Sequence, residues 1–306
     1  MLVRHGYPCD MRIMDSTQEM AEIISRHLDF DSIEPCALAR VKLIRSSNLS
    51  NSMPVIYEPA LCLVAQGKKR VVLGQVAYVY DPSQYVVATV DLPLLGSILE
   101  ASEERPFLCV SLDLDVKVLS ELLIEHGGNV PPAESRPGLV LGDVTPELTD
   151  AMVRLLRLLD TPQDIPALAP LAEREILYRL MSMDQTGMMR HIANAQSRLS
   201  QISRAILWIR SNYAEPFTVE QVADEAGMSA SSLHEHFKAV TTYSPLQFRT
   251  RLRLQEARRV MVAEGLDAAS AGFSVGYESP SQFSRDYAKA FGSPPMQDAI
   301  RLRTVT

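Results

Sequence analysis

An internal repeat in the last hundred residues constrains the fold more than any other feature of this 306-residue sequence. Each half carries a small residue, then a glycine, two apolar residues four positions apart and a proline, at nearly equal spacings. The two sets are Ala223, Gly227, Leu233, Phe237 and Pro245, and Gly272, Gly276, Phe283, Tyr287 and Pro295. Apolar residues at i and i+4 share one face of a helix, and glycine suits a turn that requires positive φ. The repeat therefore predicts two helix-turn-helix units, at about 218–240 and 266–291.

A single long helix is predicted between the two units. Ser244-Pro245 provides a cap followed by proline at the first helical position, and the helical pattern continues to about Val262. One continuous helix holds the two units at a fixed separation, and recognition helices that read one face of DNA lie about 34 Å apart. The helix carries five arginines, Arg249, Arg251, Arg253, Arg258 and Arg259. We expect about two of them to contact DNA and the others to pair with Glu256 or neighbouring acids.

The first part of the chain reads as β-structure followed by helices. Turn residues separate six short β-rich runs: Ala60–Ala65, Lys69–Leu73, Gln75–Tyr80, Gln84–Val90, Leu92–Ala101 and Phe107–Asp113. Such runs predict an antiparallel sandwich or barrel. Amphipathic helices are expected at Thr17–Leu28, Asp115–His126, Thr145–Asp160 and Ala169–Met183. The fold class is therefore α+β, with an all-α C-terminal domain.

The charge is distributed unevenly between the two parts. The whole chain has a net charge of −7, which by itself argues against binding to nucleic acid. Residues 1–190 contain 17 Lys and Arg against 26 Asp and Glu, whereas residues 191–306 contain 13 against 11. The acidity belongs to the first part, so the C-terminal part keeps a basic balance of +2 that is compatible with a DNA partner.

Two segments of the C-terminal part, RLQEARR (253–259) and VGYESPSQFSR (275–285), resemble the signature of the AraC/XylS family of bacterial transcription regulators. The segment PALCLVAQGKK (59–69) and the strands after it resemble the N-terminal domain of an AraC-like subgroup. The resemblance implies a cupin-like barrel with dimerisation helices at 1–190 and a DNA-binding domain at 191–306. It also implies a cytoplasmic homodimer that binds double-stranded promoter DNA, a small-molecule effector and RNA polymerase. Whether the protein activates or represses is left open.

The candidate DNA contacts are the residues of each recognition helix that do not face the core. Leu233 and Phe237 must point inward in the first helix, about Ala230–Val240, and Phe283 and Tyr287 in the second, Pro280–Phe291. The outward positions are Ser231, His234, Glu235 and Lys238 in the first, and Ser281, Gln282 and Arg285 in the second. Arg285 suits guanine and Gln282 suits adenine, while Glu235 can accept from cytosine N4. The competing interpretations are a solvated helix face for the first helix and an ion pair of Arg285 with Glu278 or Asp286.

Neither catalysis nor metal binding is predicted from the sequence. Residues 40–113 contain no histidine, and His234 and His236 lie two apart on a helix, so their side chains point in different directions. We expect no cofactor and no enzymatic activity, with a metal-free cupin-type enzyme as the alternative. Tyr78 and Tyr80 share one face of a strand and are candidate effector-binding residues, or else half-buried sheet residues.

The cysteines and the apolar runs exclude two further classes of protein. The four cysteines, Cys9, Cys36, Cys62 and Cys109, form no CxxC pair and no disulfide framework. Cys62 and Cys109 fall in predicted strands, where burial is expected to make a thiol inert. No apolar run reaches the roughly 20 residues that span a membrane, and we expect no membrane partner.

Overall fold

The computed structural model describes residues 9–50, 53–126, 137–184, 186–194 and 197–303, with side chains from Ser16 onward. Its internal contacts divide the chain into two compact units. Apart from residues 54–56 and 137, the first unit ends at Ser197 and the second begins at Arg198. The two units are described separately below. No helix among these residues is long and apolar enough to cross a membrane.

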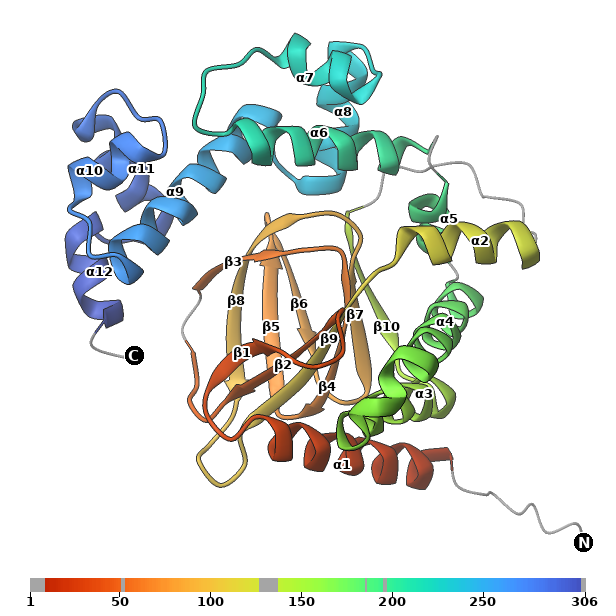
Figure 1. Ribbon diagram of the computed structural model, residues 1–306. Coiled ribbons are helices and arrows are strands. Elements are labelled where there is room, and N and C mark those ends of the chain that lie inside the picture. Colours follow the sequence, from red (N-terminus) through yellow and green to blue (C-terminus); the bar gives the residue numbers. More distant parts are fainter. Residues whose placement is uncertain (1–8, 51–52, 127–136, 185, 195–196, 304–306) are drawn as a thin grey trace, which may run out of the picture. The chain divides into compact units, whose positions relative to one another are not determined.

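The first unit is built on two antiparallel sheets (Figure 1). The six-stranded sheet has the order β1 (Ser32–Pro35), β2 (Val41–Ser46), β9 (Phe107–Asp113), β4 (Ala60–Gln66), β7 (Gln84–Ala88) and β10 (Leu139–Asp143). The four-stranded sheet has the order β3 (Met53–Tyr57), β8 (Leu92–Glu100), β5 (Lys68–Leu73) and β6 (Val76–Tyr80). The six predicted strands correspond to β4 through β9, and the predicted α+β class is confirmed.

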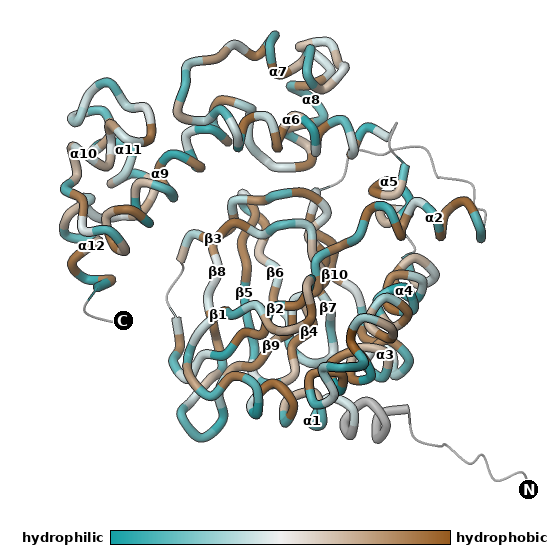
Figure 2. Tube along the Cα trace, in the orientation of Figure 1, coloured by the Kyte–Doolittle hydropathy of each residue, from teal (hydrophilic) through white to brown (hydrophobic). Residues whose placement is uncertain are grey.

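Helices cover the six-stranded sheet. α1 (Cys9–His27) packs against β4, β9 and α3 (Pro146–Arg157), and α3 packs against α4 (Ile165–Met183). This explains why β4 and β9 are buried along nearly their whole length, since both of their faces are covered. Figure 2 shows hydrophobic residues along β9 and α3. α2 (Val116–His126) packs against α5 (Met188–Ala193).

The predicted cap of α3 is present. Thr145 accepts a hydrogen bond from the backbone N–H of Leu148, and Pro146 occupies the first turn. The helix was expected to continue to Asp160, but α3 ends at Arg157 and the chain continues as the 3₁₀ turn Leu158–Asp160. All of the predicted helices in this unit are found, with ends that differ by a few residues or, at the start of α1, by more.

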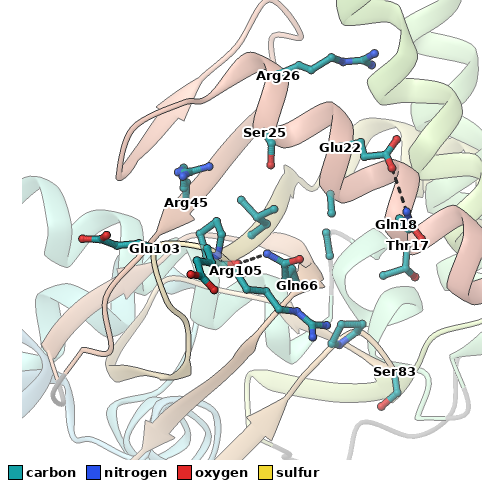
Figure 3. Close-up of a pocket in the computed structure, with 16 residues that line it drawn as sticks. Thr17, Gln18, Glu22, Ser25, Arg26, Arg45, Gln66, Ser83, Glu103 and Arg105 are labelled. Carbon is teal, nitrogen blue, oxygen red and sulfur yellow. Dashed lines mark hydrogen bonds between the residues drawn. The ribbon is translucent and has the colours of Figure 1, made fainter.

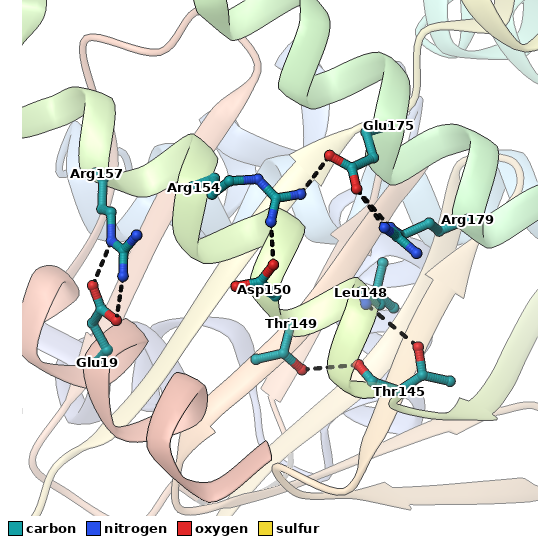
Figure 4. A network of polar contacts seen from close by, with 9 residues as sticks. All are labelled: Glu19, Thr145, Leu148, Thr149, Asp150, Arg154, Arg157, Glu175 and Arg179. Atoms are coloured by element: carbon teal, nitrogen blue, oxygen red, sulfur yellow. Dashed lines mark hydrogen bonds and ion pairs between the residues drawn. The ribbon is translucent and has the colours of Figure 1, made fainter. Parts of the chain in front are cut away.

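Ion pairs connect the solvent side of α1, α3 and α4 (Figure 4). Arg157 on α3 makes a two-pronged contact with Glu19 on α1, at 2.6 and 2.8 Å. Arg154 contacts Asp150 on its own helix and Glu175 on α4, and Arg179 also donates to Glu175. These contacts join neighbouring helices to one another, whereas the apolar stripe of α3 supplies the buried area.

The second unit is all-helical. It comprises α6 (Arg198–Asn212), α7 (Val219–Ala226), α8 (Ala230–Thr241), α9 (Pro245–Ala263), α10 (Ala268–Ser274), α11 (Pro280–Phe291) and α12 (Pro295–Arg303). α7 with α8, and α10 with α11, form the two predicted helix-turn-helix units, and α9 is the predicted long helix between them. Ser244 and Gln247 form a capping box at the start of α9.

The turns of the two units have the predicted backbone. Gly227 and Gly276 adopt φ of +65° and +88°, in the left-handed region that disfavours residues with a Cβ. Gly272 is the small residue that the repeat places ahead of Gly276. A Cβ at Gly272 would lie 3.0 Å from the Phe283 ring. The close approach of α10 and α11 therefore depends on the absence of a side chain at this position.

Candidate DNA interface and effector site

The first recognition helix presents the expected face to solvent. α8 begins after Ser229, whose hydroxyl accepts from the backbone N–H of Ser232 at 3.3 Å. Leu233 and Phe237 are fully buried. The four candidate contacts on this helix are all exposed: Ser231, His234, Glu235 and Lys238. One face of α8 thus packs in the core, and the other face is exposed to solvent.

The second recognition helix has the same arrangement. α11 begins after Ser279, which caps the N–H of Gln282, and it buries Phe283 and Tyr287. Its three candidate contacts, Ser281, Gln282 and Arg285, are exposed. In the described part of the chain no ion pair joins Arg285 to Glu278 or Asp286; instead, Asp286 accepts from the Tyr277 hydroxyl at 3.3 Å. The Arg285 guanidinium is therefore available to a ligand.

One exposed cation was missed by the sequence reasoning. Lys289 lies four residues after Arg285 and is exposed on α11. The i, i+4 spacing places the two cations on the same side of the helix. This spacing is the signal in the sequence that points to Lys289 as a further candidate contact. Both recognition helices therefore carry an exposed lysine, Lys238 on α8 and Lys289 on α11.

The arginines of α9 are engaged within the second unit. The Arg253 guanidinium donates to the carbonyl oxygens of Tyr213 and Ala214 at 2.6 and 2.9 Å. Arg259 pairs with Glu256, as expected. The remaining three contact rings or a buried acid: Arg249 over Phe217, Arg251 over Tyr243, and Arg258 with Asp298. Burial lowers the pKa of Arg253. These contacts hold α9 against other helices of the second unit, and the expectation that about two of the five arginines contact DNA stays a prediction.

The two candidate effector tyrosines have different environments. Tyr80 is 1% exposed, and its hydroxyl shares a hydrogen bond of 3.0 Å with the Tyr57 hydroxyl. Burial raises the pKa of Tyr80 well above its ordinary value, so the hydroxyl stays protonated. Tyr78 is half-buried. The Lys69 ammonium lies 5.2 Å from the Tyr57 ring centroid, so this part of the sheet combines a cation with aromatic groups.

A separate groove of about 1120 Å³ opens between α1 and the ends of β2, β4 and β9 (Figure 3). Arg45, Leu108 and Gln66 lie side by side across these three strands and line it. The Gln66 amide donates to the carbonyl oxygen of Pro106 at 2.7 Å. Neither Tyr78 nor Tyr80 lines this groove.

The cysteines depart in part from the expectation of inert thiols. Cys62 and Cys109 are buried and free. Hydrogen bonding between the two thiols, together with burial, raises the pKa of Cys109 well above its ordinary value. The same contact lowers the pKa of Cys62 to about 7, with a further contribution from the Lys69 charge. The expectation of inert thiols rests on burial alone. Burial agrees with the raised pKa of Cys109 but not with the lowered pKa of Cys62.

Sequence comparison assigns both units to known families. The profile described as "AraC-type transcriptional regulator N-terminus" matches residues 37–188, and the profile described as "Helix-turn-helix domain" matches residues 222–299. The chain belongs to the AraC family of transcription regulators. The family resemblance read from the two C-terminal segments and from 59–69 is thereby confirmed.

Curated relatives of this AraC-family chain are transcriptional activators. This chain is 28% identical over 132 residues to the HTH-type transcriptional activator RhaS of Escherichia fergusonii. The alignment covers 42% of the chain and 46% of the relative. With RhaS of Escherichia coli O1:K1 / APEC it is 23% identical over 225 residues, covering 72% of the chain and 74% of the relative. The first alignment thus spans less than half of the relative's own length.

Solved structures support the fold of this AraC-family chain. ToxT from Vibrio cholerae superposes with a TM-score of 0.59 at 11% identity, covering 85% of the chain and 97% of ToxT. ToxT with a bound unsaturated fatty acid, from Vibrio cholerae strain SCE256, gives a TM-score of 0.54 at 14% identity over 85% of the chain and 94% of ToxT. At such identities the likeness shows the shared fold.

Among the residues that the structure describes, no group of three or more histidine, cysteine, aspartate or glutamate side chains is placed to bind a metal ion. The AraC-family relatives above are named as transcriptional activators.

Proposed function

We propose that the protein is a transcription regulator that binds promoter DNA in a sequence-specific manner through α8 and α11. The observation that carries the proposal is the repeated unit itself: two helices, each buried on one side and exposed on the side that bears the candidate contacts. Because α9 connects the two units as one helix, they are suited to successive major grooves on one DNA face.

We propose distinct roles for the two recognition helices. Arg285 donates to guanine O6 and N7, and Gln282 pairs with adenine, with Ser281 and Lys289 at the backbone. On α8, Glu235 accepts from cytosine N4, His234 and Ser231 contact bases, and Lys238 contacts phosphate. The first helix-turn-helix, at 218–240, carries four acids, Glu220, Asp224, Glu225 and Glu235, against one lysine. The second helix-turn-helix is therefore expected to supply more of the electrostatic affinity.

We propose that a small-molecule effector binds in the first unit and shifts the arrangement of the DNA-binding units. A ToxT structure contains an unsaturated fatty acid, which supports effector binding for this fold but gives no ligand for this chain. Tyr78 and Tyr80 remain the proposed contacts. Since Tyr80 already bonds Tyr57, a ligand that uses its hydroxyl must join or replace that bond. Coupling requires different effector affinities for the two arrangements.

We propose a homodimer formed through the helices of the first unit. On α4, Leu168, Leu171 and Tyr178 are 46%, 64% and 43% exposed and share one side of the helix. This exposed apolar stripe supports dimerisation. RNA polymerase is the further proposed partner, and the cytoplasm the proposed location, since the promoter lies there. We propose no catalytic activity and no cofactor.

Salt dependence of DNA binding tests the proposal. The full chain is titrated by fluorescence anisotropy onto a labelled duplex that it selects from a random-sequence pool, with unrelated duplex as competitor. Affinity should fall steeply as salt rises, and Lys238→Ala and Lys289→Ala should each reduce the slope of log K against log salt by about 1. Arg105→Ala, an exposed change in the first unit, is the matched control. Binding that is weak, insensitive to salt and equal for both duplexes would favour the alternative of a metal-free cupin-type enzyme.

A further inference from the structure

A buried carboxylate connects the second recognition helix, α11, to the helices on either side of its helix-turn-helix unit, α9 and α12. Asp298 on α12 is 0% exposed. Its Oδ2 accepts from Arg258 Nε on α9 at 2.8 Å and from the Tyr287 hydroxyl on α11 at 3.0 Å. A single carboxylate oxygen therefore holds the recognition helix to the long helix and to the last helix.

Further contacts balance the negative charge of Asp298. Oδ1 of Asp298 accepts from Arg301 Nη2 at 2.5 Å. The Arg258 guanidinium lies 4.8 Å from the Phe291 ring centroid, which is a second contact between α9 and α11. Burial and the Asp298 charge raise the pKa of Tyr287, so its hydroxyl keeps the proton that it donates. The hydrogen-bonded carboxylate is thus fully compensated, the condition under which a buried charge is tolerated.

The position of Tyr287 makes the cluster relevant to DNA. Tyr287 and Arg285 are two residues apart, so they point about 200° from each other around α11. The Asp298–Tyr287 hydrogen bond on the inner side therefore fixes the rotation of α11 about its axis. That rotation decides the direction in which Arg285 and Gln282 face outward.

The first helix-turn-helix is anchored differently at the corresponding positions. In the register that aligns Pro295 with Pro245, Tyr287 corresponds to Phe237 and Asp298 to Phe248. The Phe237 and Phe248 rings pack edge to face, with centroids 5.4 Å apart. Apolar rings stay packed over a range of small displacements, whereas a hydrogen bond to one carboxylate oxygen requires a defined direction.

We propose that Asp298 is the positioning residue of the second recognition helix, which it orients independently of the first. The proposal rests on the proposed DNA-binding function. It follows that base preference can be lost in the half-site read by α11 while it is kept in the half-site read by α8.

The test is selection of bound sequences from a random duplex pool by the full chain. Arg285→Ala identifies which half of the selected site belongs to α11. Asp298→Ala should lower base discrimination in that half by about 10-fold or more, because it leaves Arg258 and Tyr287 without their acceptor, and should leave the base preferences of the other half nearly unchanged. Asp298→Asn keeps an oxygen acceptor and should restore part of the discrimination. Phe248→Leu, at the corresponding position of the first helix-turn-helix, is the matched control and should lower discrimination in the α8 half instead.

A second measurement does not depend on DNA. Tyr287→Phe removes only the hydroxyl and keeps the ring packing, so it is expected to fold. Hydrogen exchange should become faster across 280–291 and stay unchanged across 230–241. If the wild-type chain selects no specific sequence, the proposed function fails, while the exchange result still decides the role of Asp298. Equal loss of base preference in both halves by Asp298→Ala, or unchanged exchange in α11 of Tyr287→Phe, would overturn the proposal.

Discussion

The two turn glycines are equivalent in the repeat but should respond very differently to the same substitution. Gly227 and Gly276 both have positive φ, so alanine is strained at either position. At Gly227 a Cβ would meet only side-chain ends, the nearest being Arg204 Nη2 at 3.8 Å. At Gly276 it would lie 2.0 Å from the backbone carbonyl oxygen of Ala214.

These contacts set the expected cost in free energy of unfolding. Left-handed backbone costs a residue with a Cβ about 1–2 kcal/mol, which is the whole cost expected for Gly227→Ala. Gly276→Ala adds overpacking, at about 1–3 kcal/mol. It also displaces the carbonyl that Arg253 binds, and a hydrogen bond to a charged group contributes about 1.5–3 kcal/mol. We therefore expect a total of about 4 kcal/mol or more for Gly276→Ala.

The single tryptophan provides an assay that reports on the second unit. Trp208 lies on α6 beside the Phe217 ring, with centroids 5.1 Å apart, so its fluorescence follows the unfolding of this unit within the full chain. Urea titrations of the wild type and both variants yield the differences in stability. Gly227→Ala is the matched control because it shares the backbone strain without the clash. Equal costs for the two variants, or a larger cost at Gly227, would refute the reasoning from the Ala214 contact.

Two further predictions concern base recognition and pH. Arg285→Ala should lower discrimination at one base pair by about 1–3 kcal/mol, as measured by selection of bound sequences from a random pool; an unchanged sequence profile would exclude Arg285 as a base contact. Burial lowers the pKa of His191 below its ordinary value of 6.5. Below that pH the unfolded chain takes up a proton that the folded chain does not, so this contribution to stability is present above pH 6.5 and is lost as the pH falls. The thermal midpoint, followed by circular dichroism, should therefore fall less on acidification in His191→Gln than in the wild type, and parallel decreases would contradict the assignment.

The sequence predicted those elements whose cause is local. Six of the strands, the capped helices and both turns follow from alternation, capping residues and glycine, which act over a few neighbouring residues. The strands that were missed lack part of this signal. β1 has four residues and is largely exposed, β3 contains Pro54, and β10 contains Gly142. β2 does carry an alternating pattern, with Val41 and Leu43 buried, and was within reach of the same reasoning.

The candidate DNA interface likewise has features that the sequence predicts and features that it does not. Which residues of α8 and α11 face outward follows from helical periodicity, and the structure places all seven predicted positions on the exposed side. The partners of charged side chains do not follow from periodicity, because they come from segments far apart in the chain. For the arginines of α9 the sequence predicts DNA contacts and pairs with nearby acids, yet Arg253 binds the carbonyls of Tyr213 and Ala214 and Arg258 binds Asp298, 40 residues further along the chain.

The sequence by itself determined the fold class, the two helix-turn-helix units and the outward faces of their recognition helices, since each depends on spacing along one segment. Only the tertiary structure decided that Asp298 anchors α11 and that Gly276, unlike Gly227, lies against a backbone carbonyl. Both facts depend on distances between helices that are separate in sequence. The repeat makes the two units look equivalent, but packing against different neighbours makes them differ in how they are held.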